Sequence, residues 1–109
     1  MPRETRVAYF SMEIALSPAM PTYSGGLGVL AGDTIRSCAD LGVKVVAVSL
    51  LHRKGYFRQR LDRSGRQSVE PETWPLEKFL EPLSARVAVD IEDRPVEIRA
   101  WRHTVTGVD

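Results

Sequence analysis

The sequence predicts an α/β fold in which a βαβ unit is followed by an antiparallel β-hairpin extension. Two short runs rich in valine and aromatic residues are separated by a glycine loop and a helical pattern, and two pairs of strand-like segments joined by turn residues come later. Strand, helix and strand in this order form a βαβ unit, because parallel strands need a long crossover connection. We expect this unit over residues 1–51 and the β-rich extension over residues 52–109.

The βαβ unit is expected to contain two buried parallel strands, Val7–Ser11 and Val43–Leu51, because both segments are short and mainly apolar. Between them lies a helix with one apolar face. The residues at helical spacing on that face are Leu27, Leu30, Ala31, Thr34, Ile35, Cys38 and Leu41. Gly42 stands where a left-handed C-terminal cap belongs. Asp33 is expected one turn into the helix, where an acid interacts favourably with the helix dipole.

The extension is expected to hold two β-hairpins. In the first, Tyr56–Leu61 and Arg66–Val69 flank the turn residues Asp62–Gly65. In the second, Glu92–Pro95 joins two segments that alternate apolar and polar residues, with Val87, Val89 and Ile91 before it and Val96, Ile98 and Ala100 after it. The prolines between the hairpins leave room for a short helical piece at most.

Composition excludes several classes of function. The net charge of +1 supplies no electrostatic case for binding nucleic acid or an anionic membrane. The longest apolar stretch, Val45–Leu51, is too short to span a bilayer. Cys38 is the single cysteine, and no cysteine or acid lies near either histidine at a metal-like spacing, so we assign neither a disulfide nor a metal site. A cytoplasmic location is expected.

The glycine loop is the strongest local signal for function. Gly25, Gly26 and Gly28 run straight into the predicted helix. A helix that begins there directs free N–H groups and the positive end of its dipole at a ligand, which favours phosphate. The alternative is a tight strand-to-helix turn in which glycine serves only packing, because short glycine patterns have many false positives.

Several separated blocks, in the right order, resemble the N-terminus of α-glucan (glycogen and maltodextrin) phosphorylases. The blocks are Ala8–Glu13, Tyr23–Asp33, Ala39–Gly42, Leu51–Gln59, Glu72–Pro75, Trp101–Arg102 and Val105–Asp109. They cover nearly the whole chain and are therefore more specific than one loop. The short interval between Glu13 and Gly25 is typical of the compact bacterial or archaeal type of these enzymes.

The resemblance implies a glycosyltransferase with two Rossmann-like domains, of the GT-B type, and an active site between them. It implies reversible phosphorolysis of α-1,4-glucans to α-glucose 1-phosphate. It also implies pyridoxal phosphate, whose attachment lysine belongs to a C-terminal domain absent from this chain. We therefore expect a fragment that is inactive alone and carries no catalytic residue. The expected partners of the full-length enzyme are the glucan and phosphate, with a homo-oligomer as an option.

The resemblance also assigns candidate binding residues. The backbone amides of Gly25, Gly26 and Leu27 would face the substrate phosphate and the glucosyl unit. Glu13 aligns with a glutamate near that loop, and we hypothesise that its carboxylate accepts hydrogen bonds from loop amides or hydroxyls. Val29 stands where the long enzymes often carry an arginine, so no cationic contact is expected from this position.

Two other functions remain open at this stage. Nucleotide-sugar-dependent glucan synthases share a similar loop but carry a lysine just ahead of it, where this chain has Tyr23 and Ser24. A non-catalytic glucan-binding or assembly module is the third possibility.

Overall fold

A computed structural model describes residues 5–108 of the chain, with the exception of the side chain of Tyr56. Residues 1–4 and Asp109, at the two ends of the expected range 1–109, lie outside the described residues. The chain divides into two compact units. One comprises Met1–Trp74 and Val105–Asp109, and the other comprises Pro75–Thr104.

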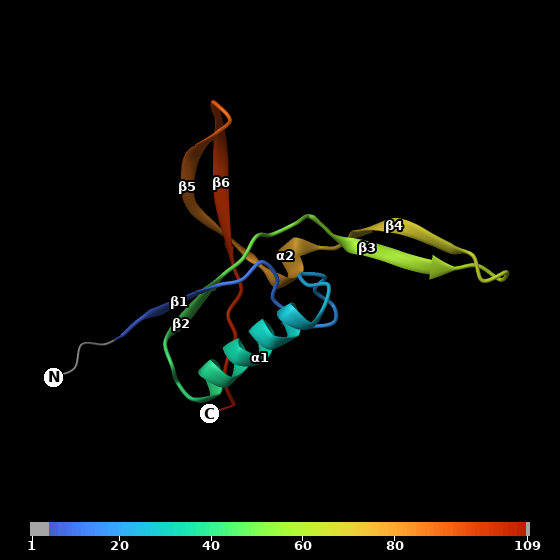
Figure 1. Cartoon of the computed structure of the whole chain (residues 1–109). Helices are drawn as coiled ribbons and strands as arrows, with labels where there is room; N and C mark the ends of the chain where they lie inside the picture. Colours follow the sequence, from blue (N-terminus) through green and yellow to red (C-terminus); the bar gives the residue numbers. More distant parts are fainter. Residues whose placement is uncertain (1–4, 109) are drawn as a thin grey trace. The chain divides into compact units, whose positions relative to one another are not determined.

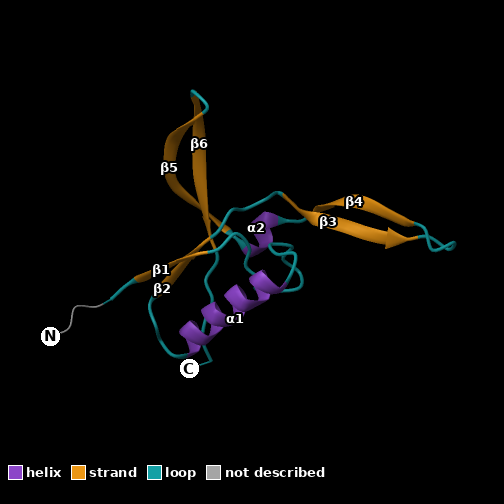
Figure 2. Ribbon diagram, in the orientation of Figure 1, coloured by secondary structure: helices purple, strands orange, loops and turns teal. Residues whose placement is uncertain are grey.

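The first unit contains the predicted βαβ elements (Figure 1). Its elements are β1 (Val7–Phe10), α1 (Gly26–Asp40), β2 (Val45–Val48), β3 (Lys54–Leu61) and β4 (Gln67–Thr73). Strands β1 and β2 pair in parallel, with Val7 opposite Val45 and Phe10 opposite Val48. The α/β class and the parallel pairing are therefore confirmed, and Figure 2 shows α1 as the main helix of the chain.

The expected burial of β1 and β2 is wrong for this chain. Phe10 is 75% exposed and Val46 is 66% exposed. The physical reason is the size of the sheet, because β1 and β2 form a sheet of two strands within the described residues. A parallel sheet buries its strands only where both of its faces are covered.

The buried side chains of the first unit are instead Ile14, Met20 and Ala31. The first two come from the segment that joins β1 to α1. That segment folds back on itself, because the amide of Ile14 donates to the carbonyl of Thr22 and the hydroxyl of Thr22 donates to the carbonyl of Ile14, at 3.2 and 2.5 Å. The connection between β1 and α1 is therefore an ordered part of the core.

Helix α1 ends as the sequence predicts. Gly42 has a positive φ of 70°, and its amide donates to the carbonyl of Ala39. The amide of Val43 donates to the carbonyl of Cys38 at 2.9 Å. These two bonds form a Schellman motif, in which the left-handed glycine allows the last carbonyls of the helix to be satisfied.

The buried face of α1 differs from the expected apolar face. Ala31 of the expected face is buried, but the other two buried residues are Gly28 and Gly32, whereas Leu30 is 62% exposed. The two glycines let the preceding segment approach the helix closely. The amide of Ala15 donates to the carbonyl of Gly28 at 2.9 Å, and a Cβ on Gly32 would collide with the carbonyl oxygen of Ala15. Backbone contact, which needs small residues, therefore determines the orientation of this helix.

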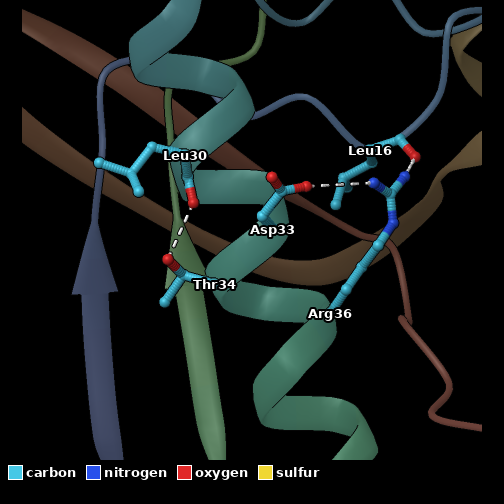
Figure 3. A network of polar contacts seen from close by, with 5 residues as sticks. All are labelled: Leu16, Leu30, Asp33, Thr34 and Arg36. Carbon is cyan, nitrogen blue, oxygen red and sulfur yellow. Dashed lines mark hydrogen bonds and ion pairs between the residues drawn. The ribbon is translucent and has the colours of Figure 1, made fainter.

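A polar network also joins α1 to the same segment (Figure 3). The guanidinium of Arg36 donates to the carbonyl of Leu16 and lies 4.0 Å from the carboxylate of Asp33. Next to Asp33, the hydroxyl of Thr34 donates to the carbonyl of Leu30 at 2.8 Å. The expected dipole interaction of Asp33 is wrong, because α1 begins at Gly26 and its first turn contains no acidic residue.

The first predicted hairpin is formed by β3 and β4, which pair antiparallel from Leu61 opposite Gln67 to Lys54 opposite Thr73. The turn between them includes Gly65, which has a φ of 84°. The carboxylate of Asp62 accepts hydrogen bonds from the amides of Ser64 and Arg66 at 2.9 and 2.8 Å. The side chain that opens the turn therefore satisfies the turn's own backbone.

The second unit contains a short helix and the second predicted hairpin. Its elements are α2 (Leu76–Phe79), β5 (Glu81–Ile91) and β6 (Arg94–Arg102). The two strands pair antiparallel, with Val89 opposite Val96. The connection is shorter than expected, because Glu92 and Asp93 alone turn the chain, with φ of 50° and 61°. Positive φ at both central residues is typical of a type I′ turn, whose twist matches that of the flanking strands.

Candidate functional site

The glycine loop lies at the N-terminus of α1. Gly25 is the N-cap in an extended conformation, and helical bonding begins with the amides of Gly28 and Val29, which both donate to the carbonyl of Gly25. Within residues 5–108, the amides of Gly26 and Leu27 have no hydrogen-bond partner. These two N–H groups and the positive end of the helix dipole are therefore available to an anion.

Glu13 lies beside this loop and bonds to it. One carboxylate oxygen, Oε2, accepts hydrogen bonds from the amide of Ser24 at 2.5 Å, from the amide of Gly25 at 3.2 Å and from the hydroxyl of Ser24 at 3.3 Å. The bond from the amide of Ser24, above the other contacts, lowers the pKa of Glu13, while partial desolvation acts in the opposite direction. Glu13 is therefore ionised at neutral pH and has the loop contacts that the hypothesis named.

The structure brings all four candidate residues together at the loop. The backbone amides of the three loop residues differ, however, in whether they already have a hydrogen-bond partner. The amide of Gly25 is bonded to Glu13, whereas the amides of Gly26 and Leu27 are without a partner in the described residues. The arrangement therefore narrows the possible anion donors to Gly26 and Leu27. Whether the loop binds phosphate stays a prediction.

The glycines of the motif occupy two kinds of environment. A Cβ built on Gly25 or Gly26 would meet nothing within 4 Å. A Cβ on Gly28 would lie 2.5 Å from Cβ of Tyr23 and 3.0 Å from Oε2 of Glu13. Packing within the described chain therefore explains glycine at position 28, whereas it leaves open space at positions 25 and 26.

A cavity of about 170 Å³ lies beside the loop, and its lining includes Glu13, Thr22, Tyr23, Ser24 and His52. A second cavity, of about 310 Å³, lies at the carboxyl ends of β1 and β2, between Phe10–Met12 and Val48–Leu50. Ligands of open α/β sheets bind at this edge.

Sequence reasoning missed the structural importance of Gly28 and Gly32. Both are buried, and both allow the segment after β1 to approach α1. Their separation by four residues places them on one face of the helix. This spacing of two glycines inside a helix was the available signal, because glycine is unfavourable there without a packing reason.

The described residues do not fit an attachment site for pyridoxal phosphate. Lys44, Lys54 and Lys78 are exposed, and neither cavity is lined by a lysine. Since the aldehyde of this cofactor forms a Schiff base with a lysine amine, we derive no step through the cofactor in this chain.

Among the described residues, no group of three or more histidine, cysteine or acidic side chains could hold a metal ion. No helix among them is long and apolar enough to cross a membrane.

Comparison with known proteins gives close relatives over almost the whole chain. It is 43% identical over 112 aligned positions to maltodextrin phosphorylase from Thermococcus litoralis, covering 96% of this chain. It is 40% identical over 105 positions to glycogen phosphorylase from Mycobacterium tuberculosis, covering 89% of this chain. The chain is a relative of the α-glucan phosphorylases. The resemblance stated from the sequence motifs is thus confirmed.

This relationship extends to a more distant enzyme, the glycogen phosphorylase of Aquifex aeolicus, which is 29% identical over 106 positions. No protein-family model matches the chain. The chain spans 14%, 12% and 15% of the lengths of these three relatives, so it corresponds to a short part of each of them.

Proposed function

We propose that this chain is the N-terminal part of an α-glucan phosphorylase that releases α-glucose 1-phosphate from α-1,4-glucans by reversible phosphorolysis. In this proposal the βαβ unit over residues 1–51 begins the first Rossmann-like domain of a two-domain GT-B glycosyltransferase. This proposal is carried by the loop at the start of α1, where the amides of Gly26 and Leu27 have no partner among the described residues and a Cβ on Gly26 would meet nothing within 4 Å. The names of the relatives indicate which anion such a loop would receive.

The loop would act by holding donors in place for an oxyanion. In our proposal the amides of Gly26 and Leu27 donate to phosphate or to the departing sugar phosphate, and the helix dipole adds a favourable field. Backbone donors that are already oriented stabilise developing charge without reorganisation, which is why such groups contribute strongly to catalysis. The carboxylate of Glu13 serves the loop and not the anion, because like charges repel.

The full-length enzyme would hold pyridoxal phosphate outside this chain, since the lysines described here do not fit its attachment. When bound, this cofactor supplies a phosphate group that assists the reaction. The 109-residue chain alone would therefore be inactive.

An assay of the full-length protein tests the proposed function. Maltodextrin and inorganic phosphate, without any nucleotide sugar, are expected to yield glucose 1-phosphate. Glucan elongation that requires ADP-glucose would instead identify a synthase. Binding of maltodextrin without turnover under either condition would identify a non-catalytic module. Both of these results would overturn the proposal.

A further inference from the structure

Gly28 provides the space that Glu13 needs to reach the loop. A Cβ at position 28 would lie 3.0 Å from Oε2 of Glu13, the same oxygen that accepts the amides of Ser24 and Gly25. The 2.5 Å separation from Cβ of Tyr23 is well below the roughly 3.5–4.0 Å at which carbon atoms make contact. Even the smallest side chain at this position must therefore displace Tyr23, Glu13 or the helix.

The backbone of Gly28 also anchors the segment that carries Glu13. Its carbonyl accepts the amide of Ala15 at 2.9 Å, two residues beyond Glu13. Gly28 thus bonds to the segment after β1 through its carbonyl, and its lack of a Cβ leaves room for the carboxylate of Glu13. These two features place the carboxylate of Glu13 against the amides that precede α1.

We propose that Gly28 is a positioning residue of the glycine loop and that it acts through Glu13. This inference rests on the proposed function. By leaving room for Glu13, Gly28 lets the carboxylate fix the amides of Ser24 and Gly25. The next two amides, of Gly26 and Leu27, then keep no partner within the described residues and remain available to the anion.

The direction in which phosphate affinity changes when Glu13 is replaced distinguishes two roles for its carboxylate. The carboxylate either orients the loop amides or only repels the anion by its charge. A carboxylate close to a bound phosphate repels it, so removal of the charge alone would strengthen phosphate binding. Removal of a group that orients the donors would weaken phosphate binding instead, because small displacements of a binding group reduce reactivity strongly.

The first experiment compares Gly28→Ala with Gly42→Ala in the full-length protein. We expect Gly28→Ala to raise KM for phosphate about tenfold and to raise KM for maltodextrin by a smaller factor, since the amides assigned to the anion are displaced, whereas a long glucan has most of its contacts outside the loop. Gly42→Ala is the matched control, because it strains the positive φ at the other end of α1 without touching the loop. It is expected to lower stability and leave KM for phosphate unchanged. An unchanged KM for phosphate in Gly28→Ala would overturn the proposal.

A second pair of variants decides the question even if Gly28→Ala does not fold. Glu13→Ala is expected to raise KM for phosphate to a similar extent. Glu13→Gln, which keeps an oxygen that can accept the same amides, is expected to recover most of that loss. Tighter phosphate binding in Glu13→Ala would show that the carboxylate only repels the anion, and would overturn the positioning role.

Gly26→Ala distinguishes failure of this inference from failure of the proposed function. Damage to phosphate use in Gly26→Ala, combined with normal phosphate KM in Gly28→Ala and Glu13→Ala, would remove the positioning role and keep the phosphate loop. Normal phosphate use in Gly26→Ala would remove the phosphate loop itself, and the positioning role with it.

Discussion

Two carboxylates in the first unit accept hydrogen bonds from backbone amides, one in a hairpin turn and one at the glycine loop. Asp62 accepts the amides of Ser64 and Arg66 in the β3–β4 turn, and Glu13 accepts the amides of Ser24 and Gly25 at the glycine loop. The hydroxyl of Ser64 is the main cause that lowers the pKa of Asp62, whereas the amide of Ser24 is the main cause for Glu13. In both cases, hydrogen bonds to the charged form favour ionisation.

The two settings differ in which amides are left over. In the β3–β4 turn the amide of Gly65 also has a partner, because it donates to the carbonyl of Asp62 at 3.0 Å. At the glycine loop, Gly26 and Leu27 keep unpartnered amides within the described residues. In the β3–β4 turn the bonded amides close the turn on itself, whereas the glycine loop leaves two consecutive amides without a partner at the N-terminus of a helix, where the dipole favours an anion.

The largest expected effect is a loss of activity on substitution in the glycine loop, which would distinguish this loop from the β3–β4 turn. In the full-length protein, Gly26→Ala is expected to lower kcat/KM for phosphate by about a hundredfold, because a methyl group would hold the anion away from the donors. Stability should stay unchanged or rise slightly, since the Cβ would meet no atom of the described residues within 4 Å and alanine favours helices. Steady-state kinetics and a thermal melt measure the two quantities. A large loss of stability would show that Gly26 serves packing after all.

In the β3–β4 turn, a substitution is expected to lower stability and to leave activity unchanged, which is the reverse of the pattern expected for Gly26→Ala. Gly65→Ala forces a side chain into a φ of 84° and should cost about 1 kcal/mol of unfolding free energy. The kinetic constants should not change, because this turn is assigned no role in binding. Urea unfolding followed alongside the phosphorolysis assay measures both. An unaltered urea midpoint would mean that the turn relaxes at no cost.

The smallest expected effect concerns pH. The pKa of Asp62 is lower in the folded chain than its ordinary value, so its contribution to stability is present at neutral pH. That contribution is lost as pH falls below about 4 and through the lowered pKa of the folded state. Asp62→Asn should therefore reduce the acid sensitivity of the urea midpoint. Equal pH dependence in both proteins would show that these hydrogen bonds do not contribute.

Much of the local structure was predictable from the sequence, because its interactions join neighbouring residues. The turn at Asp62–Gly65 and the Schellman motif at Gly42 are satisfied within a few positions of the chain. Alternation in the second hairpin placed Val89 and Val96 on paired strands for the same local reason. The resemblance to the α-glucan phosphorylases could also be found from the sequence, because it rests on short motifs that occur in the same order along the chain.

The tertiary structure decided which residues meet across longer intervals. It turned Gly28 and Gly32, and not the leucines, toward the segment after β1, because backbone contact needs small residues and leaves no mark in an apolar pattern. It also bonded the amide of Gly25 to a carboxylate 12 positions earlier, and it left the amides of Gly26 and Leu27 without a partner in the part of the chain that the structure describes. The sequence by itself therefore determined the elements and the motif, and the packing of the segment after β1 against α1 decided which donors of that motif remain open to a ligand.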